Sequence, residues 1–519
     1  MDQRIILCLI DSAAPYIDIS KDKLEQFFIN ELNSAQQKQA AHKVSLPFKQ
    51  QLDISCKTTP LFLEKLSKKT SFTEVKLNFL SLYLKYLCGD TGKIAWQDIT
   101  PVSEQDLTSY NSISDQCIEL GKTMISKAAV LKLNGGLGTT MGCKGPKSSI
   151  KVTDNLSFLE LIAAQMNALR RLYNTPVPLI LLNSYYTSAE TAAILSNTID
   201  YMDLSQNEFP RIDTVTGFPF IYHADPDQEW NPPGHGDIFS VLHTSGLLDQ
   251  LLDKGISYLF ISNADNLGAV LDPKILGFIC ENKIDFLMET TLKSNQDVKG
   301  GTLVRHHNHL QLLERAQVEQ SHLTDFEDIK TFKVFNTNSI WLNLSTLKQA
   351  LSSGFLKLPL IVNEKTIHDH PVVQLETAMG AGIAHFKNSC SVIVDRNRFL
   401  PVKKTSDLMI LQSDLIEKDD NGNFKFSPNR KISAYPPIRL SSHFNTVDDY
   451  MKRITAPPSL KEMTSLTLDG DITIGPNVIF KGEVKIHVEK GQAIHLEAVT
   501  MENEQWIADS CGRTKRSKI

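Results

Sequence analysis

The residues best suited to bind phosphate lie in one stretch, LKLNGGLGTTMGCKGPKS, at positions 131–148. Glycines allow a phosphate group to approach backbone N–H donors closely, because they carry no Cβ atom. The stretch departs from two common patterns. A proline, and not a glycine, precedes its Lys-Ser pair, and Gly136, Gly138 and Gly142 are spaced one residue too wide for the dinucleotide fingerprint. It therefore predicts a nucleotide-binding loop of a third kind.

A carboxylate suited to magnesium follows a second apolar run. Asn263 and Asp265 come directly after residues 258–262, whose sequence YLFIS is typical of a buried strand. A carboxylate at the end of such a strand can bind a Mg²⁺ ion that bridges phosphate oxygens, since this hard cation prefers oxygen ligands. A capping role for Asp265 agrees equally well with the sequence.

Five further polar residues lie in loops or at the ends of expected strands. They are His235 in WNPPGHGDIF, Asn336 and Asn338 in FNTNSIW, Glu376 in the stretch 362–380, and Lys403 in RFLPVKKTSDL. The amides and the carboxylate are of the kind that binds sugar hydroxyls. Each signal is weak alone, because a Gly/Pro turn explains the histidine and a surface lysine pair explains Lys403.

Two histidine-rich stretches, 306–309 and 368–370, resemble metal clusters. We interpret both as exposed loops, because no second pair of ligands falls at a recognised spacing. The chain also has no G-x-S-x-G and no H-E-x-x-H motif, so a hydrolase triad or a zinc protease is unsupported.

The composition is that of an ordinary globular protein, with 519 residues, 41% hydrophobic and 22% charged. A formal charge of −5 gives no general attraction to nucleic acid or to an anionic membrane. The eight cysteines are scattered without a C-x-x-C motif, which favours a reducing compartment. The apolar run at residues 4–10 is too short to span a membrane and makes a poor signal peptide. We therefore expect a cytoplasmic protein.

The type of secondary structure that the sequence predicts around these residues changes twice along the chain. Residues 1 to about 100 are expected to be mostly helical. Alternating strand and helix signals then predict a parallel sheet, with strands at 128–133, 178–182 and 258–262. Ligands of such sheets lie at the carboxyl ends of the strands. A Ser157…Glu160 capping box begins one helix, and Asp272-Pro273 begins another.

Near residue 430 the pattern changes to short β-branched runs separated by Gly or Asn turns. The stretch LTLDGDITIGPNVIFKGEVKIHVEKG, residues 466–491, predicts a β-solenoid whose coils stack their apolar edges.

Six motifs together resemble one family. KLNGGLGTTMGCKGPKS, PPGHGDIF, SNADNLGA, DVKGGTL, FNTNSIW and RFLPVKKTSDL occur in the order typical of eukaryotic-type UTP–glucose-1-phosphate uridylyltransferases, over about residues 100 to 480. The resemblance implies an α/β fold with a helical N-terminal region (1–105), a Rossmann-like nucleotidyltransferase domain (106–430) and a C-terminal left-handed β-helix with a tail (431–519). The tail leaves the family pattern after about residue 490, so homo-oligomerisation through the C-terminal domain stays open.

The resemblance also implies the reaction. UTP and α-D-glucose 1-phosphate would form UDP-glucose and pyrophosphate, with Mg²⁺ as cofactor and with no nucleic-acid or membrane partner. The implied nucleotide-binding residues are Leu133, Asn134, Gly135, Gly136, Lys147, Gln206, Gly234 and Asp265, with Gln206 at the uracil edge. The implied sugar-phosphate contacts are His235 and Asn263, to which the sequence adds Asn336, Asn338 and Glu376 for the sugar. Asp265 would hold the metal, and Lys403 and Lys147 would be catalytic.

Two alternatives stay open at the level of sequence. An N-acetylhexosamine 1-phosphate uridylyltransferase would carry a Gly-Gly-Gln-Gly-Thr-Arg type of loop, whereas residues 135–140 read GGLGTT and lack the arginine. A catalytically silent nucleotide-sugar sensor is disfavoured because it would have no physical reason to keep Lys147, His235, Asp265 and Lys403 together.

Overall fold

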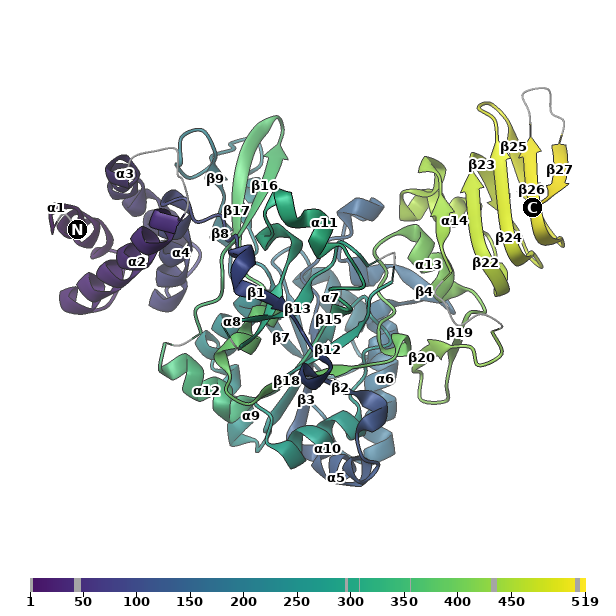
Figure 1. Cartoon of the computed structure of the whole chain (residues 1–519), viewed down its shortest axis with the longest axis horizontal. Coiled ribbons are helices and arrows are strands. Elements are labelled where there is room, and N and C mark those ends of the chain that lie inside the picture. The colour runs from purple at the N-terminus through teal and green to yellow at the C-terminus, as the bar shows by residue number, and fades with distance from the viewer. Residues whose placement is uncertain are drawn as a thin grey trace. The chain divides into compact units, whose positions relative to one another are not determined.

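The computed structural model describes residues 3–41, 48–294, 297–307, 309–354, 356–430, 436–508 and 514–519 of the chain. The chain forms two compact units, each built from three segments. Figure 1 labels their helices and strands. Unit 1 comprises Met1–Thr108, Leu204–Leu259 and Asn282–Val392, and unit 2 comprises Ser109–Asp203, Phe260–Glu281 and Ile393–Ile519. Both units combine helices with sheets, so the fold is mixed α/β. The domain limits expected from the sequence stay a prediction.

The N-terminal part of unit 1 is helical, as predicted. Its helices are α1 (Gln3–Ala13), α2 (Lys21–Ala41), α3 (Phe48–Ser67) and α4 (Thr73–Leu87). Fully buried aromatic rings join α3 to α4, with the centroids of Phe62 and Tyr83 4.5 Å apart. The same core reaches a later segment, because Phe79 packs edge-on against Phe209 and the Tyr83 hydroxyl donates to the Gly217 carbonyl at 2.8 Å.

The strands of unit 1 are mostly antiparallel. The bounds are β1 (Ile99–Pro101), β2 (Leu107–Ser109), β8 (Phe209–Pro210), β9 (Ile212–Asp213), β10 (Trp230–Asn231), β12 (Phe286–Leu292), β13 (Thr302–His306), β14 (His309–Leu313), β15 (Val334–Asn343), β16 (Ile361–Ile367), β17 (His370–Glu376) and β18 (Ser389–Ile393). Strand β12 pairs antiparallel with β15, β13 lies between β1 and β14, and β17 lies between β16 and β9. The helices α8 (Ile238–Thr244), α9 (Leu247–Asp253), α11 (Leu323–Phe326) and α12 (Leu344–Ser352) complete the unit.

Unit 2 contains the predicted parallel pair. Its strand β3 (Ala128–Leu133) pairs parallel with β6 (Leu179–Asn183), and β11 (Tyr258–Asn263) is the other neighbour of β3. Residues Ala128–Leu131 are all buried, as expected for a parallel strand covered on both faces. The remaining elements here are α5 (Gln116–Met124), β4 (Lys151–Thr153), β5 (Leu156–Ser157), α6 (Phe158–Tyr173), α7 (Ser188–Leu195), β7 (Met202–Ser205) and α10 (Pro273–Asn282).

The predicted capping box begins α6. The Ser157 hydroxyl accepts the Glu160 N–H at 3.3 Å, and the Glu160 carboxylate accepts the Ser157 N–H at 2.7 Å. Two otherwise unpaired N–H groups of the first turn are thus satisfied.

The C-terminal part of unit 2 contains stacked parallel strands, as the repeat predicted. The elements are α13 (Thr405–Gln412), β19 (Ile416–Lys418), β20 (Phe424–Phe426), β21 (Ile438–Leu440), α14 (Val447–Arg453), β22 (Ser459–Asp469), β23 (Asp471–Ile474), β24 (Ile479–Val488), β25 (Ala493–Leu496), β26 (Thr500–Ala508) and β27 (Thr514–Lys518). Leu468, Ile486 and Trp506 occupy matching positions of successive strands and are buried. Strand β27 pairs antiparallel with β26, and the Arg516 guanidinium lies 3.6 Å from the Trp506 ring centroid. The tail therefore covers the outer edge of the last rung.

None of the helices among the described residues combines the length and the apolar content that crossing a bilayer requires.

Candidate active site

The glycine loop of unit 2 leaves the carboxyl end of β3 and closes on itself. The Lys147 N–H donates to the Gly136 carbonyl at 3.0 Å, and Leu137 and Pro146 form a short antiparallel bridge. A Cβ atom added at Gly136 would meet no other atom within 4 Å. The main chain at this position is therefore open to a ligand, as the phosphate-binding interpretation requires.

The Asn134 side chain has a structural task. It is buried, donates to the Asn183 Oδ1 at 2.7 Å and to the Thr191 hydroxyl at 2.9 Å, and accepts from the Ser148 hydroxyl. These bonds tie the start of the loop to β6, to α7 and to the residue after Lys147. A nucleotide contact at this position is thus left to the main chain.

Asp265 lies just beyond the carboxyl end of β11 and forms an ion pair with Lys147 through its Oδ2. The Lys147 side chain is only 19% exposed and the Asp265 side chain only 16%. Within the described part of the chain, the buried Oδ1 of Asp265 has no hydrogen-bond partner. A buried carboxylate oxygen without a donor is costly, so this atom is suited to a cation or a donor supplied by a ligand.

Lys403 lies at the start of α13, beside Asp407. The Asp407 Oδ2 accepts the N–H of Lys403 at 2.8 Å and the N–H of Lys404 at 2.9 Å. Burial raises the pKa of Asp407, while these two bonds and the charges of Lys147 and Lys403 lower it. The charges of both lysines therefore favour the ionised form of the same carboxylate.

Asn266 positions this cluster, and it lies in the SNADNLGA motif with Asn263 and Asp265, just beyond the apolar run. It is buried, its Oδ1 accepts the Leu400 N–H at 2.9 Å, and its Nδ2 donates to the Arg398 carbonyl at 3.1 Å. Gly268 supports the same approach, because a Cβ atom there would lie 2.2 Å from the Asn397 carbonyl oxygen. The turn after β11 and the segment before Lys403 are thus fastened together.

In unit 1 the structure brings Gln206 and Gly234 together. The Gln206 Nε2 donates to the Gly234 carbonyl at 3.1 Å. Gly234 has a φ of 78°, and a Cβ atom there would lie 2.5 Å from the Thr377 carbonyl oxygen, so the position requires glycine. The amide of Gln206 is thereby oriented, with its Nε2 toward Gly234.

The neighbouring residue Asn207 is held by Asp237, and no motif in the sequence singled out this pair. The Asn207 N–H and Nδ2 donate to the two Asp237 carboxylate oxygens at 2.7 and 2.8 Å. Burial raises the pKa of Asp237 to about 6, although both bonds from Asn207 favour the charged form.

His235 is held as a neutral imidazole. Its Nδ1 accepts the Met379 N–H at 3.0 Å, and burial lowers the pKa of the ring to about 4. A neutral ring that accepts at Nδ1 carries its proton on Nε2. His235 can therefore donate one hydrogen bond from Nε2 to a ligand at neutral pH.

Asn336 and Asn338 lie at a bulge of β15. The register places Ser339 opposite Glu289 but Asn336 opposite Thr290, so two residues of β15 have no counterpart on β12. Asn338 has a φ of 60°, and its N–H donates to the Asn336 Oδ1 at 2.9 Å. Bulges and left-handed residues of this kind re-aim side chains and concentrate at functional sites.

Glu376 ends β17 and is largely enclosed. Burial raises the pKa of its carboxyl group, and the Asn363 Nδ2 donates to its Oε1 at 2.9 Å. In the orientation that satisfies its amide, Gln374 also donates to Glu376 at 3.0 Å and accepts from the Arg211 Nε at 2.8 Å. A carboxylate fixed by amides is a precise acceptor for hydroxyl groups.

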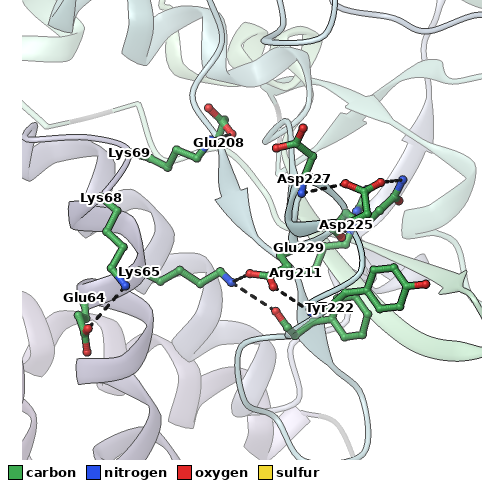
Figure 2. A network of polar contacts seen from close by, with 12 residues as sticks. Glu64, Lys65, Lys68, Lys69, Glu208, Arg211, Tyr222, Asp225, Asp227 and Glu229 are labelled. Carbon is green, nitrogen blue, oxygen red and sulfur yellow. Dashed lines mark hydrogen bonds and ion pairs between the residues drawn. The ribbon is translucent and has the colours of Figure 1, made fainter. Parts of the chain in front are cut away.

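The N-terminal helices support the segment that carries Gln206. As Figure 2 shows, Lys65 of α3 reaches Glu229, and Lys69 lies beside Glu208 at 2.8 Å. The Lys65 and Glu229 side chains are 12% and 11% exposed, and both lysine ammonium groups lie over the Trp230 ring at 5.2 and 5.3 Å. The helical region thus holds residues 208–230 by partly buried charges, a role for which the sequence carried no signal.

Comparisons with known proteins agree with the motifs. Residues 77–481 match the family model described as UTP--glucose-1-phosphate uridylyltransferase. The barley (Hordeum vulgare) UTP--glucose-1-phosphate uridylyltransferase is 40% identical over 437 residues, which cover 83% of this chain and 92% of the relative. A crystal structure of UDP-glucose phosphorylase from Trypanosoma brucei aligns with a TM-score of 0.79 and 36% identity, over 87% of this chain and 100% of that one.

A UDP-glucose pyrophosphorylase mutant from Leishmania major, solved in complex with UDP-glucose, aligns with a TM-score of 0.80 and 31% identity, over 87% of this chain and 99% of that one. Family model, relatives and solved structures thus agree over most of the length of the chain. The chain belongs to the UTP–glucose-1-phosphate uridylyltransferase family.

Proposed function

We propose that the chain joins UTP to α-D-glucose 1-phosphate and releases UDP-glucose and pyrophosphate, reversibly, by in-line attack of the sugar phosphate on the α-phosphorus of UTP. The observation that carries the proposal is the cluster of Lys147, Asp265, Lys403 and Asp407 beside an open glycine loop. Two cations and a carboxylate with an unsatisfied oxygen are gathered where backbone amides are accessible, which suits a polyphosphate.

The reaction needs charge neutralisation and alignment more than a protein nucleophile. The attacking phosphate oxygen is already ionised at neutral pH, so no base is required to generate it. Lys147 and Lys403 would hold the phosphates of the two substrates and offset their repulsion. The N–H groups of Gly135 and Gly136, next to Leu133, would add donors without side-chain bulk. Lysine suits this role because its compact ammonium group can follow charge between oxygens.

Mg²⁺ fits the donor set at Asp265. The unpartnered Oδ1 is a hard oxygen ligand, and Lys147 occupies the other oxygen. When bound, the ion would supply positive charge shared with phosphate oxygens. Asp265 would hold it, while Lys147 turns to the nucleotide phosphates.

Gln206 would recognise uracil. Because its Nε2 is engaged by the Gly234 carbonyl, its Oε1 can accept a hydrogen bond from an N–H group of a ligand. Uracil presents an N–H at ring position 3, whereas cytosine presents an acceptor there. The fixed amide would therefore favour UTP over CTP, since the wrong base leaves two acceptors facing each other.

The sugar phosphate would be bound by His235 and Asn263, and the glucose hydroxyls by Asn336, Asn338 and Glu376. The neutral His235 offers an Nε2 donor without adding charge. The bulge at Asn338 and the amides around Glu376 hold their polar atoms in defined positions. A site of this kind rejects an analogue that leaves a buried polar group unpaired.

A coupled pyrophosphate-release assay tests the proposal. The purified chain is incubated with Mg²⁺, UTP or CTP, and glucose, galactose or N-acetylglucosamine 1-phosphate. Release with UTP and glucose 1-phosphate, well above the other pairs, is expected. Preference for N-acetylglucosamine 1-phosphate, or no release with any pair, would overturn it.

Three finer points are part of the proposal. The parallel rungs between residues 438 and 508 would wind as a left-handed β-helix, and the protein would act in the cytoplasm. A homo-oligomer built through the outer edge of β26 would first have to displace β27, which occupies that edge. Light scattering can compare the molecular mass of the full chain in solution with that of a version ending at residue 508. Only the shortened chain is expected to associate through that edge.

A further inference from the structure

A histidine pair and a carboxylate meet in unit 1, apart from the residues discussed above. One ligand atom from each of Asp98, His306 and His307 lies within 4.8 Å of the other two. They meet because β1 pairs antiparallel with β13, with Ile99 opposite His306, and Asp98 directly precedes Ile99. The interpretation of residues 306–309 as a plain exposed loop is therefore incomplete, since the third group comes from a distant part of the chain.

The turn that carries Asp98 is packed against the core. Asp98 ends the short 3₁₀ turn Trp96–Asp98, and its N–H donates to the Ala95 carbonyl at 3.0 Å. The Trp96 ring stacks on His322 at 4.8 Å and packs against a buried apolar cluster. That cluster consists of Val304, Leu313, Val318, Phe326 and Phe332. The turn cannot move away from β13 without exposing this apolar surface.

The two imidazoles are also oriented. His306 is the last residue of β13, and His307 follows with a φ of 45°, which brings the two ring centroids to 4.2 Å. Each ring has a nitrogen within 4.8 Å of the ligand atoms of the other two groups, and an imidazole nitrogen is a common metal ligand.

We propose that Asp98, His306 and His307 bind a divalent transition-metal ion of the Zn²⁺ class. Two imidazole nitrogens and one carboxylate oxygen suit Zn²⁺, Co²⁺ and Ni²⁺, whereas Mg²⁺ and Ca²⁺ prefer oxygen ligands alone. Bonds of about 2.0–2.2 Å require the three groups to contract around the ion. The exposed His307 side chain can supply this movement by changing rotamer. Water would complete the coordination.

A bound ion would clamp the hairpin of β13 and β14. The hairpin closes at the pair His306 and His309, and its other end begins just after Gly301, whose carbonyl accepts the Asn336 N–H at 2.9 Å. The ion would link the hairpin tip to the turn that carries Asp98. It would therefore stabilise the folded state by mass action and raise the unfolding temperature with increasing metal concentration.

The test uses the full chain, without an affinity tag, in excess Mg²⁺ so that oxygen-only sites are filled. Equilibrium dialysis with Zn²⁺ and visible absorption with Co²⁺ measure binding, and the Co²⁺ spectrum separates a nitrogen and oxygen site from cysteine ligation. One bound equivalent with no thiolate absorption is expected. His307→Asn and Asp98→Asn should each lower the affinity about 10-fold or more, in line with losses from disturbed metal shells.

His368→Asn is the matched control. His368 lies in the turn between β16 and β17 with the same φ of 45° as His307, and asparagine tolerates this conformation at both positions. This variant should keep the full affinity and the metal-dependent rise in unfolding temperature. UDP-glucose formation should be unchanged in all three variants, which shows that they fold. Affinity that survives His307→Asn and Asp98→Asn, or that falls equally in His368→Asn, overturns the proposal.

Discussion

The carboxylate of Asp407 accepts the backbone N–H of Lys403 at 2.8 Å, and this bond fixes where the Lys403 side chain leaves the start of α13. Lys147 also lowers the pKa of the same carboxyl group, so the charges of the two lysines that the motifs single out both act on it. Asp265 pairs with Lys147, and Asp407 accepts a hydrogen bond from the backbone of Lys403. Phosphate groups would replace the carboxylates as partners when substrates bind.

Removing the Lys403 ammonium group should abolish most of the turnover. We expect Lys403→Ala to lower kcat at least ~100-fold, the effect of losing one preorganised group that stabilises transition-state charge. Lys404→Ala is the control, because this lysine is the exposed neighbour in the same dipeptide. Steady-state pyrophosphate release measures both. Near-normal turnover in Lys403→Ala would remove the assignment.

Asp265→Asn should change the response to magnesium. The substitution keeps the shape but removes the charge that binds Lys147 and the proposed ion. We expect a fall in kcat of about 100-fold and a higher Mg²⁺ concentration at half-maximal rate. A titration of rate against Mg²⁺ at fixed UTP measures both quantities. An unchanged Mg²⁺ midpoint would show that the ion is held elsewhere.

Gln206→Ala should weaken the choice between UTP and CTP. Losing one oriented hydrogen bond to the base should reduce the ratio of kcat/KM values for the two nucleotides about 10-fold or more. Gln228→Ala is a suitable control, since this glutamine lies in the same unit but contacts Asp225 on the surface. The idea fails if both variants discriminate as well as the unchanged chain.

The buried pair of Lys65 and Glu229 should matter for stability far more than the exposed pair of Lys68 and Glu64, both drawn in Figure 2. Lys65→Ala leaves Glu229 charged, enclosed and unpaired, so a loss of about 3 kcal/mol in the free energy of unfolding is expected. Lys68→Ala should change it by less than about 0.5 kcal/mol. Urea denaturation compares the two, and equal losses would contradict the assigned support role of α3.

Asp237 should give the fold a measurable pH dependence. Burial raises the pKa of Asp237 to about 6, above its value in the unfolded chain. Its folded-state contribution is therefore complete below about pH 4 and is lost as pH rises through about 6. Between pH 7 and pH 5 the carboxyl group should add about 1 kcal/mol to the free energy of unfolding.

Asp237→Asn should lack this acid-side gain. Denaturation curves at pH 7 and pH 5 isolate it as the difference between the variant and the unchanged chain. His235 acts in the opposite direction, because burial lowers its pKa to about 4, so stability from the neutral ring is lost as pH falls below about 6.5. His235 is present in both proteins, so its effect cancels when Asp237→Asn is compared with the unchanged chain. If the free energy of unfolding changes equally in the two proteins between pH 7 and pH 5, Asp237 does not titrate in this range.

Several helices and strands could be predicted from local sequence patterns alone. The apolar run of β3, the capping box at Ser157 and the repeating rungs near residue 470 depend on neighbours a few positions away, so they could be read along the chain. The motifs likewise singled out Lys147, Asp265 and Lys403 through the family resemblance, and their roles stay predictions.

Only the tertiary structure shows which of these side chains are buried and which lie next to one another. Asn134 looked like a ligand-binding residue, yet its side chain is buried against Asn183 and Thr191. Asp98 carried no signal until β1 paired with β13 and placed it beside His306. Sequence determines residue type and local conformation because these depend on short-range sterics and hydrogen bonding. Strand pairing and burial depend on contacts across hundreds of residues, and only the folded chain determines those.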